Sequence, residues 1–429
     1  MVNMKTTVLV FTIIIVFSSC DLFKDKDTDP VYQTKIAWDS GLYSNDYQEY
    51  MVDGDSVFFY ERPPGYSTVN IYALTRLDAE TGRFIWRSSV LFKGIVFCQP
   101  VAIDGYVYVF LRSNVILCFN REIGECTARV RVDIDNKNLE FMDFATAYRD
   151  YLYLGLWTNG KYFVRFDVNL IDQSGDTAMQ NITPEILWQP ETGGYVYAQP
   201  IVYKNVIYTG TNIRIQGVEG KPVEVAGFDT DTKEMAFHVS FGGPEDIGVN
   251  ARSIESGIKD NPIFIHDNVL YYLSTSISAW DIATGEKLYR HVFTNDLPYS
   301  KIYMAETLQA VFYKGNIYFT NLVSYVSNEP DSFRNIYCIN AATGKLVWNT
   351  IAKHSISLDT NPVIAHDKLY VPQHHGLWVY NPENGKLIGV DRSFLGASFG
   401  RNILYKDYMI CVRMENNNEG KLVAVYVGK

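Results

Sequence analysis

The stretch that decides the fold reads Asp78-Ala-Glu-Thr-Gly82-Arg-Phe-Ile-Trp86. It recurs as Asp281-Ile-Ala-Thr-Gly285-Glu-Lys-Leu-Tyr289 and as Asn340-Ala-Ala-Thr-Gly344-Lys-Leu-Val-Trp348, and weaker copies span residues 120–128, 229–237 and 381–389. An Asp or Asn side chain accepts hydrogen bonds from the backbone that follows it, and Gly adopts a positive φ at little cost. Each copy therefore predicts a tight turn between two strands.

A hairpin pattern precedes each of these turns. Gln99-Pro-Val-Ala-Ile-Asp-Gly-Tyr-Val-Tyr108 and Asn361-Pro-Val-Ile-Ala-His-Asp-Lys-Leu-Tyr370 place apolar runs around Asp-Gly or His-Asp, which is typical of paired strands. Aligned on the turn, eight hairpins begin at Glu49, Gln99, Phe144, Gln199, Asn261, Gln309, Asn361 and Arg401. Their starts are 40 (401−361) to 62 (261−199) residues apart, so a β module of about 50 residues repeats around the chain.

Each module predicts four strands: the hairpin, a third strand, the Asp/Asn-x-x-Thr-Gly turn and a fourth strand. The third module needs an insertion, because a polar segment separates Asp167 from Trp188. The last module lacks a fourth strand after residues 422–426, and residues 35–38 at the other end supply one. We therefore predict an all-β, eight-bladed β-propeller of four-stranded antiparallel blades over residues 35–429, closed by N- and C-terminal strands in one blade.

The repeat resembles the quinoprotein-like (PQQ-repeat) eight-bladed propellers, and the resemblance covers nearly all of the chain beyond residue 34. That family has a docking motif, Ala-x-Asp-x-x-x-Gly-x-x-x-Trp, in which the Trp packs between blades over the Gly turn. The resemblance implies a structural docking role for Trp38, Trp86, Trp188 and Trp348 and for Gly82, Gly285 and Gly344. Phe237 and Tyr289 substitute for the Trp, while Ala128 and Gly389 abandon it.

The N-terminus has the layout of a secretory signal. Residues 1–5 are basic, residues 6–17 are apolar, and two serines precede Cys20. The apolar run is too short to span a bilayer. Phe17-Ser-Ser-Cys20 resembles a bacterial lipobox, which implies a signal peptide over residues 1–19, lipidation of Cys20 and a tether over residues 20–34; a plain signal peptide is the alternative.

The implied location is the bacterial cell envelope, with the protein lipid-anchored and facing the periplasm or the surface. The outer membrane is favoured. The inner membrane stays open, because an Asp directly after the lipidated cysteine, as at Asp21, resembles an inner-membrane retention signal.

Charge and cysteine usage exclude several classes of protein. With 38 Lys and Arg against 48 Asp and Glu the net charge is −10, the wrong sign for binding nucleic acid. No zinc, haem-attachment, Gly-x-Ser-x-Gly or His-Glu-x-x-His pattern occurs, so we expect no metal, no cofactor and no catalytic residue. Cys118 and Cys126 flank a predicted turn; a disulfide and two buried free thiols are both open, and the thiols are favoured.

The strand order divides the loops between two faces. Turns between strands one and two and between strands three and four fall on one face and are short. Nearly every long connection falls on the other: 61–65, 211–225, 242–260, 294–306 and 327–332. Long loops on a rigid scaffold often carry function, so we expect binding contacts there.

The residues that open the innermost strands should ring the channel mouth on the long-loop face. They are Glu49, Gln99, Phe144, Gln199, Asn261, Gln309, Asn361 and Arg401, of which five are amides. Amides can hold a small polar ligand or a glycan, and they can equally satisfy backbone groups in a turn.

Three functions follow, in order of preference. The first is a non-catalytic, lipid-anchored scaffold that binds other envelope proteins, because length, anchor and repeat resemble the lipoprotein of the outer-membrane β-barrel assembly machinery. The second is a periplasmic or surface protein that binds a glycan or small ligand, favoured by 31 Tyr and the amide ring. The third is a quinone-dependent dehydrogenase; those enzymes carry an adjacent cysteine pair and a longer chain, and no two cysteines are adjacent here.

Overall fold

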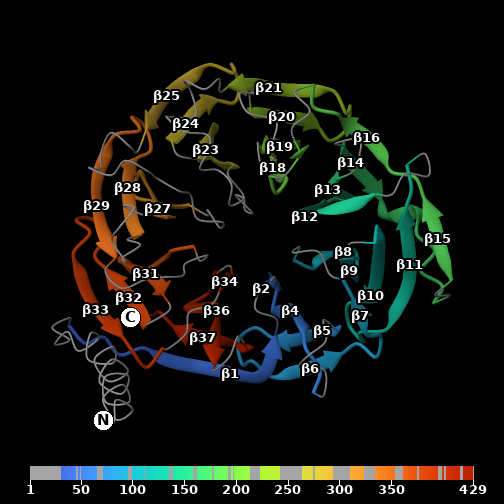
Figure 1. Cartoon of the computed structure of the whole chain (residues 1–429), viewed down its shortest axis with the longest axis horizontal. Coiled ribbons are helices and arrows are strands. Elements are labelled where there is room, and N and C mark those ends of the chain that lie inside the picture. The colour runs from blue at the N-terminus through green and yellow to red at the C-terminus, as the bar shows by residue number, and fades with distance from the viewer. Residues whose placement is uncertain are drawn as a thin grey trace, which may run out of the picture.

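The computed structural model of the chain shows eight blades arranged in a ring, all built from β-strands (Figure 1). This confirms the predicted eight-bladed propeller. The residues that the structure describes are 30–44, 47–48, 50–64, 71–94, 99–111, 113–134, 139–157, 162–175, 178–191, 195–196, 198–212, 223–241, 263–273, 276–292, 310–322, 334–352, 361–373, 376–394, 399–400, 402–415 and 419–428.

Blades 1 to 4 follow one another in chain order, each with its strands numbered outward from the centre of the ring. Blade 1 contains β3 (Tyr50–Asp53), β4 (Ser56–Glu61), β5 (Ile71–Asp78) and β6 (Phe84–Arg87), with β7 (Phe92–Lys93) beside β5. Blade 2 contains β8 (Val101–Ile103), β9 (Tyr106–Leu111), β10 (Val115–Asn120) and β11 (Cys126–Val132). Blade 3 contains β12 (Glu140–Tyr148), β13 (Tyr151–Trp157), β14 (Tyr162–Asp167) and β16 (Glu185–Trp188). Blade 4 contains β18 (Ile201–Tyr203), β19 (Val206–Asn212), β20 (Val223–Asp229) and β21 (Met235–Phe241), with β17 (Tyr195–Val196) beside β19.

Blades 5 to 8 repeat the arrangement. Blade 5 contains β22 (Ile263–His266), β23 (Val269–Leu273), β24 (Ser276–Asp281) and β25 (Lys287–Val292). Blade 6 contains β26 (Val311–Tyr313), β27 (Asn316–Leu322), β28 (Arg334–Asn340) and β29 (Leu346–Ala352). Blade 7 contains β30 (Val363–Ala365), β31 (Lys368–Gln373), β32 (Gly376–Tyr380) and β33 (Leu387–Asp391). Blade 8 contains β35 (Ile403–Tyr405), β36 (Tyr408–Glu415), β37 (Glu419–Tyr426) and β1 (Lys35–Ser44), and a short parallel pair joins β2 (Tyr47–Gln48) to β34 (Phe399–Gly400).

Blade 8 joins the two ends of the chain, as predicted. β1 pairs antiparallel with β37 from Lys35 opposite Tyr426 to Ser44 opposite Gly420. Ser44 also pairs with Glu61 of β4, which links blade 8 to blade 1. The ring is therefore closed by hydrogen bonds between segments that lie almost 400 residues apart.

Burial explains why the second and third strands of a blade read as continuous apolar runs. Every residue of β4 and of β32 is buried, because each blade is packed between two others. The outermost strands alternate instead; in β6 only Trp86 is buried. Each fully buried large apolar side chain contributes roughly 1.5–3 kcal/mol, so most of the stability lies in the cores between blades.

Aromatic rings of the outermost strands cover the turn glycine of the next blade. A Cβ added to Gly82 would lie 2.5 Å from Trp38 Cδ2, and one added to Gly124 would lie 2.5 Å from Trp86 Cε3. These glycines have φ of +66° and +74°, so they both supply the left-handed turn and leave room for the ring. Gly344 lies under Tyr289, and Gly385 lies under Trp348, in the same way.

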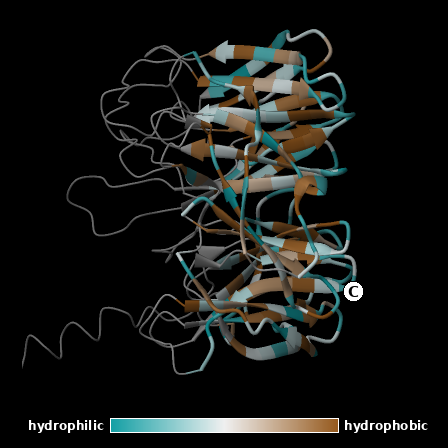
Figure 2. Ribbon diagram, turned by 90° about the vertical axis from the view of Figure 1, so that its right-hand side faces the viewer, coloured by the Kyte–Doolittle hydropathy of each residue, from teal (hydrophilic) through white to brown (hydrophobic). Residues whose placement is uncertain are grey.

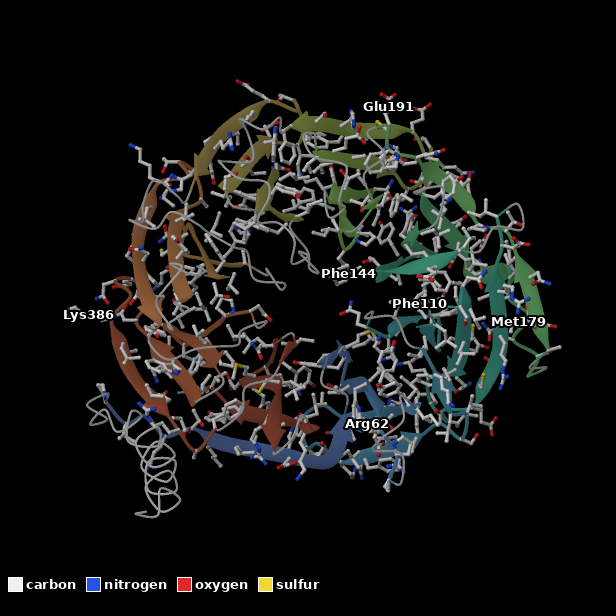
Figure 3. The ribbon with its side chains drawn as sticks, viewed as in Figure 1. Arg62, Phe110, Phe144, Met179, Glu191 and Lys386 are labelled. Atoms are coloured by element: carbon white, nitrogen blue, oxygen red, sulfur yellow. The ribbon has the colours of Figure 1, made fainter. Side chains whose placement is uncertain are left out.

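Blade 2, whose docking position holds Ala128, carries a fifth strand instead of an aromatic ring. The insertion predicted in the third module contains η2 (Val168–Leu170) and β15 (Met179–Ile182), and β15 pairs parallel with β11 on the outside of blade 2. Figure 1 shows β15 outside β11, and Figure 3 places Met179 on the outer rim. Val168 and Ile171 share a buried cluster with Ala128, so the insertion fills the space that a docking ring fills elsewhere.

Blade 7, whose docking position holds Gly389, is covered by residues 30–34, which we call the strap. Val31 forms a parallel bridge with Val390. The Tyr32 amide donates to the Val390 carbonyl at 2.9 Å, and the Val390 amide donates to the Pro30 carbonyl at 2.8 Å. A Cβ on Gly389 would lie 2.9 Å from the Pro30 oxygen. Residues 30–34, which belong to the predicted tether, thus contact the propeller; Cys20 and the predicted signal peptide lie outside the described residues.

Candidate functional site

The ring has two faces that differ in their connections. Because each blade is an antiparallel meander, turns between strands one and two and between strands three and four share one face, which we call the short-turn face. The remaining connections share the long-connection face. Figure 2 views the ring from the side, with tight turns and the C-terminal end of the chain on the right.

Polar side chains on the short-turn face form hydrogen bonds from one blade to the next. Lys314 Nζ donates to Asp367 Oδ1 at 2.8 Å, from blade 6 to blade 7, and Tyr313 donates to the same carboxylate. Lys406 Nζ donates to Glu80 Oε2 at 2.7 Å, from blade 8 to blade 1. The hydrogen bond to Asp367 raises the pKa of Lys314. Each exposed pair of this kind contributes little to stability. The pairs nevertheless connect adjacent blades, and their side chains are already occupied.

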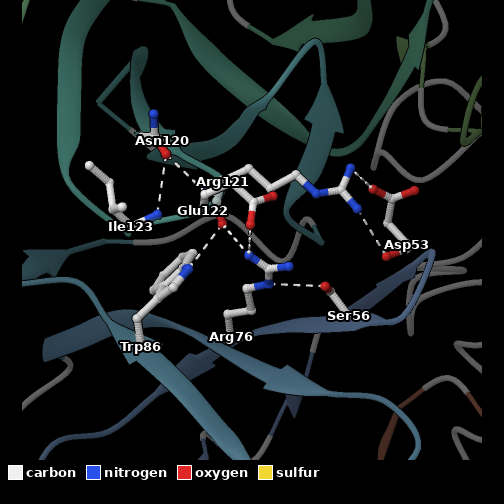
Figure 4. Close-up of polar contacts among 8 residues, drawn as sticks. All are labelled: Asp53, Ser56, Arg76, Trp86, Asn120, Arg121, Glu122 and Ile123. Carbon is white, nitrogen blue, oxygen red and sulfur yellow. Dashed lines mark hydrogen bonds and ion pairs between the residues drawn. The ribbon is translucent and has the colours of Figure 1, made fainter.

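Blades 1 and 2 share the densest group of such contacts (Figure 4). Arg76 Nη1 donates to the Arg121 carbonyl at 2.9 Å and to Glu122 Oε2 at 2.7 Å, and Arg76 Nε donates to Ser56 Oγ at 3.0 Å. Arg121 reaches back to pair with Asp53. The hydrogen bond from Arg76 lowers the pKa of Glu122. Each charge in the group has a partner within it, so the group joins two blades.

Of the predicted channel-mouth residues, Asn361 has a clear structural role. It is 6% exposed. Its Nδ2 donates to the Asn402 carbonyl at 2.9 Å, and its Oδ1 accepts from the Asn402 amide at 2.7 Å. The Asn402 Nδ2 in turn donates to the Asn361 carbonyl at 2.6 Å. The Asn361 amide therefore joins blade 7 to blade 8 and is engaged before any ligand arrives.

The other predicted mouth residues divide into three groups. Gln99 and Gln199 lie just before β8 and β18 and are partly exposed. Phe144 lies in the middle of β12, not at its start, because β12 begins at Glu140; it is 3% exposed, and Figure 3 shows it on the inner side of blade 3. The rest lie outside the described residues: Glu49, Asn261, Gln309 and Arg401.

Comparison with known proteins bears on the fold. No family model and no curated protein sequence matches the chain. BamB from Moraxella catarrhalis matches at a TM-score of 0.61 and 13% identity, over 92% of this chain and 100% of that chain. A quinohemoprotein alcohol dehydrogenase from Comamonas testosteroni matches at 0.65 and 12%, over 92% and 77%, and a europium-containing methanol dehydrogenase at 0.63 and 10%, over 91% and 93%. The fold is that of the quinoprotein-like propellers.

Quinoprotein-like propellers include enzymes, so we asked whether the residues present here fit a quinone with its metal ion. Among the described residues, no group of three or more His, Cys, Asp or Glu side chains is placed to hold a metal. Cys118, Cys126, Cys338 and Cys411 are free thiols. Cys118 packs in the core between blades 2 and 3, whereas Cys126 packs against the core between blades 1 and 2. The described residues therefore do not fit a quinone with its metal ion.

The propeller also buries carboxylates near the long-connection face that the sequence pattern did not single out. Glu61, at the end of β4, is 1% exposed and accepts from Thr75 Oγ1 at 2.7 Å and from Arg87 Nε at 2.8 Å. Glu224, near the start of β20, is 4% exposed, and no described group donates to its Oε2. A lone acid inside an apolar strand, as in Val223-Glu-Val-Ala-Gly-Phe228, was the available signal.

No helix among the described residues is both long and apolar enough to cross a membrane.

Proposed function

We propose that the chain is a lipid-anchored, non-catalytic scaffold of the bacterial cell envelope that binds other proteins through its long-connection face. The observation that carries the proposal is the difference between the two faces. On the short-turn face the charged side chains bind one another across blades, as Lys314 binds Asp367 and Lys406 binds Glu80. Nearly every long connection of the sequence is expected on the opposite face, where loops on a rigid ring are available for contacts.

The fold comparison and the N-terminal sequence support the same class of protein. The match to BamB covers 100% of that chain, so the two propellers have comparable extents. It agrees with the resemblance, stated from the repeat and the lipobox, to the lipoprotein of the β-barrel assembly machinery. The sequence has no adjacent cysteine pair, which favours a scaffold over a quinone-dependent dehydrogenase.

Site-specific photocrosslinking in cells tests the proposal. A photoreactive residue at Lys93 or Pro64, both exposed and both on the long-connection face, should form adducts with envelope proteins. The same residue at Ile123 or Glu383, exposed on the short-turn face, is the matched control and should form far fewer. Equal adducts from both faces, or none from Lys93 and Pro64, would contradict the scaffold.

Glycan or small-ligand binding is the second candidate, and two partly exposed amides favour it. Asn361 is buried and bonded to Asn402, so this candidate is tested at the partly exposed Gln99 and Gln199. Glycan-array binding that a combined Gln99→Ala and Gln199→Ala change abolishes, with unfolding unchanged, would favour this function over the scaffold.

A further inference from the structure

Four junctions between blades share one docking arrangement. An aromatic ring from the outermost strand lies on the turn glycine of the next blade, and a ring donor bonds the carbonyl of the second turn residue. Trp86 Nε1 donates to the Arg121 carbonyl at 2.9 Å, and Tyr289 OH donates to the Ala341 carbonyl at 2.9 Å. The other two pairs are Trp38 with Ala79, at 3.1 Å, and Trp348 with Pro382, at 2.9 Å.

The junction between blades 4 and 5 has the same turn without the ring. Gly285 has φ of +71°, and no described atom lies within 4 Å of a Cβ added to it. Ile282 holds the equivalent carbonyl, and no described group donates to that oxygen. Phe237 stands where the docking residue is expected, but its ring packs against Tyr208, with centroids 5.8 Å apart, and it has no donor. We call Gly285 with the Ile282 carbonyl the vacant docking position.

The surroundings of this position are more exposed than those of three of the four filled positions. Gly124, Gly344 and Gly385 are buried under their rings, whereas Gly285 is half-buried. Gly82, under Trp38, is also half-buried, and Phe84 beside it is 49% exposed. Cys126, Leu346 and Leu387 each pack in the same cluster as the docked ring beside them. The corresponding residue of blade 5 is Lys287, which pairs with Trp280 and is exposed. An ammonium at this place attracts the face of an aromatic ring.

We propose that the vacant docking position binds a tryptophan side chain presented by a partner protein. The indole ring would lie on Gly285, its N–H would donate to the Ile282 carbonyl, and Lys287 would approach its face. Tryptophan fills three of the four equivalent positions in this chain, and it is a frequent anchor of protein interfaces. The site lies at the rim of the short-turn face and depends neither on the lipid anchor nor on the long-connection face.

A direct test uses N-acetyl-L-tryptophanamide as the probe. With the mature chain labelled at glycine nitrogens, the probe should shift the Gly285 amide resonance saturably, with a dissociation constant in the millimolar range expected of a single side chain. The analogue methylated on the indole nitrogen should bind several-fold more weakly. The Gly344 amide, already covered by Tyr289, is the internal control. No shift at Gly285 up to the solubility limit, or an equal shift at Gly344, would overturn the proposal.

Filling the position from within the chain gives a second readout. Phe237→Trp places an indole where the other junctions have one and should abolish the shift at Gly285. If that variant does not fold, Gly285→Asn serves instead, with asparagine nitrogens labelled so that the amide of position 285 is still observed. Asn tolerates a positive φ, and Lys233 already occupies the equivalent turn position of blade 4 at φ +68°. A shift that persists in the folded variant would place the probe elsewhere and overturn the assignment.

In cells, a photoreactive residue at Glu286 reports on the same position. Glu286 and Lys345 are both exposed and both follow a turn glycine, one uncovered and one covered. Adducts from position 286 should map to a tryptophan of the partner, should exceed those from position 345, and should disappear with Phe237→Trp. Adducts from Lys93 report the scaffold face separately, so either proposal can fail while the other holds. Adducts from 286 that map away from tryptophan would overturn this one.

Discussion

Gly124 and Gly285 have almost the same backbone and opposite surroundings. Their φ angles are +74° and +71°. A Cβ on Gly124 would lie 2.5 Å from Trp86, whereas one on Gly285 would meet no described atom within 4 Å. The pair therefore separates two reasons why a repeat keeps glycine: the conformation of the turn and the room that a docked ring needs.

Replacing each of the two glycines by alanine should distinguish these reasons. Gly285→Ala should cost only the left-handed strain, about 1–2 kcal/mol. Gly124→Ala should cost the same strain plus the displacement of Trp86, a further 1–3 kcal/mol or so typical of overpacking. Urea denaturation of the two variants and the parent measures both free energies of unfolding. Equal losses would show that Trp86 adjusts freely, or that blade 5 is covered as blade 2 is.

At the scale of elements, the sequence predicted the four-strand module and the closing strand pair but missed the segments added outside two blades. The four-strand module follows from a turn and two apolar runs within about 50 residues. The outer additions do not, because β15, inserted in blade 3, pairs with β11 of blade 2 across three intervening strands, and the strap meets β33 from more than 350 residues away. Ala128 and Gly389 interrupt the docking pattern of the sequence. In the structure another segment pairs with the outermost strand at each of them, β15 at Ala128 and the strap at Gly389.

The sequence alone does not show contacts between blades or register shifts within a strand, and both affect the predicted channel mouth. Asn361 looked available because its partner, Asn402, belongs to the next blade. Phe144 was aligned by counting back from the turn, but a register shift between Phe141 and Ala145 lengthens β12, so the count ended inside the strand. The short-turn contacts join side chains of two adjacent blades, as Lys314 joins Asp367, and no single module encodes them.

The strap should be displaced if blade 7 regains a docking ring. In Gly389→Trp, the new side chain would start where the Pro30 carbonyl and Tyr32 now lie, each 2.9 Å from the added Cβ. The Tyr32 amide, which bonds Val390, should then exchange its hydrogen at least tenfold faster, while the Trp38 amide in β1 is unchanged.

Ile388→Trp is the matched control for this change. It adds the same ring one residue away, at a side chain that is already 38% exposed, and should leave the Tyr32 amide protected. If Gly389→Trp also leaves Tyr32 protected, the strap is held by its other contacts, such as the Thr34 amide bond of 2.6 Å to Asp391 Oδ2.

At the scale of the whole molecule, the ring depends on one junction that no covalent bond secures. Seven junctions join blades that follow each other in the chain, whereas the eighth is made when β1 meets β37. The sequence indicated this closure because the last module lacked a fourth strand and the first residues after the predicted tether offered one. Unfolding should therefore begin where β1 separates, since that step frees chain at both ends.

A disulfide across this junction should stabilise the ring far more than the same bond elsewhere. Lys35 and Tyr426 are cross-strand partners, both exposed, and Lys35→Cys with Tyr426→Cys closes a loop of 391 (426−35) residues. His266→Cys with Val269→Cys, partners across a two-residue turn, closes a loop of only 3 (269−266). In the chain-entropy model the two differ by about 4 kcal/mol, although strain reduces such gains. Thermal unfolding with and without reductant measures both; similar gains for the two bonds would show that the ring does not open at β1.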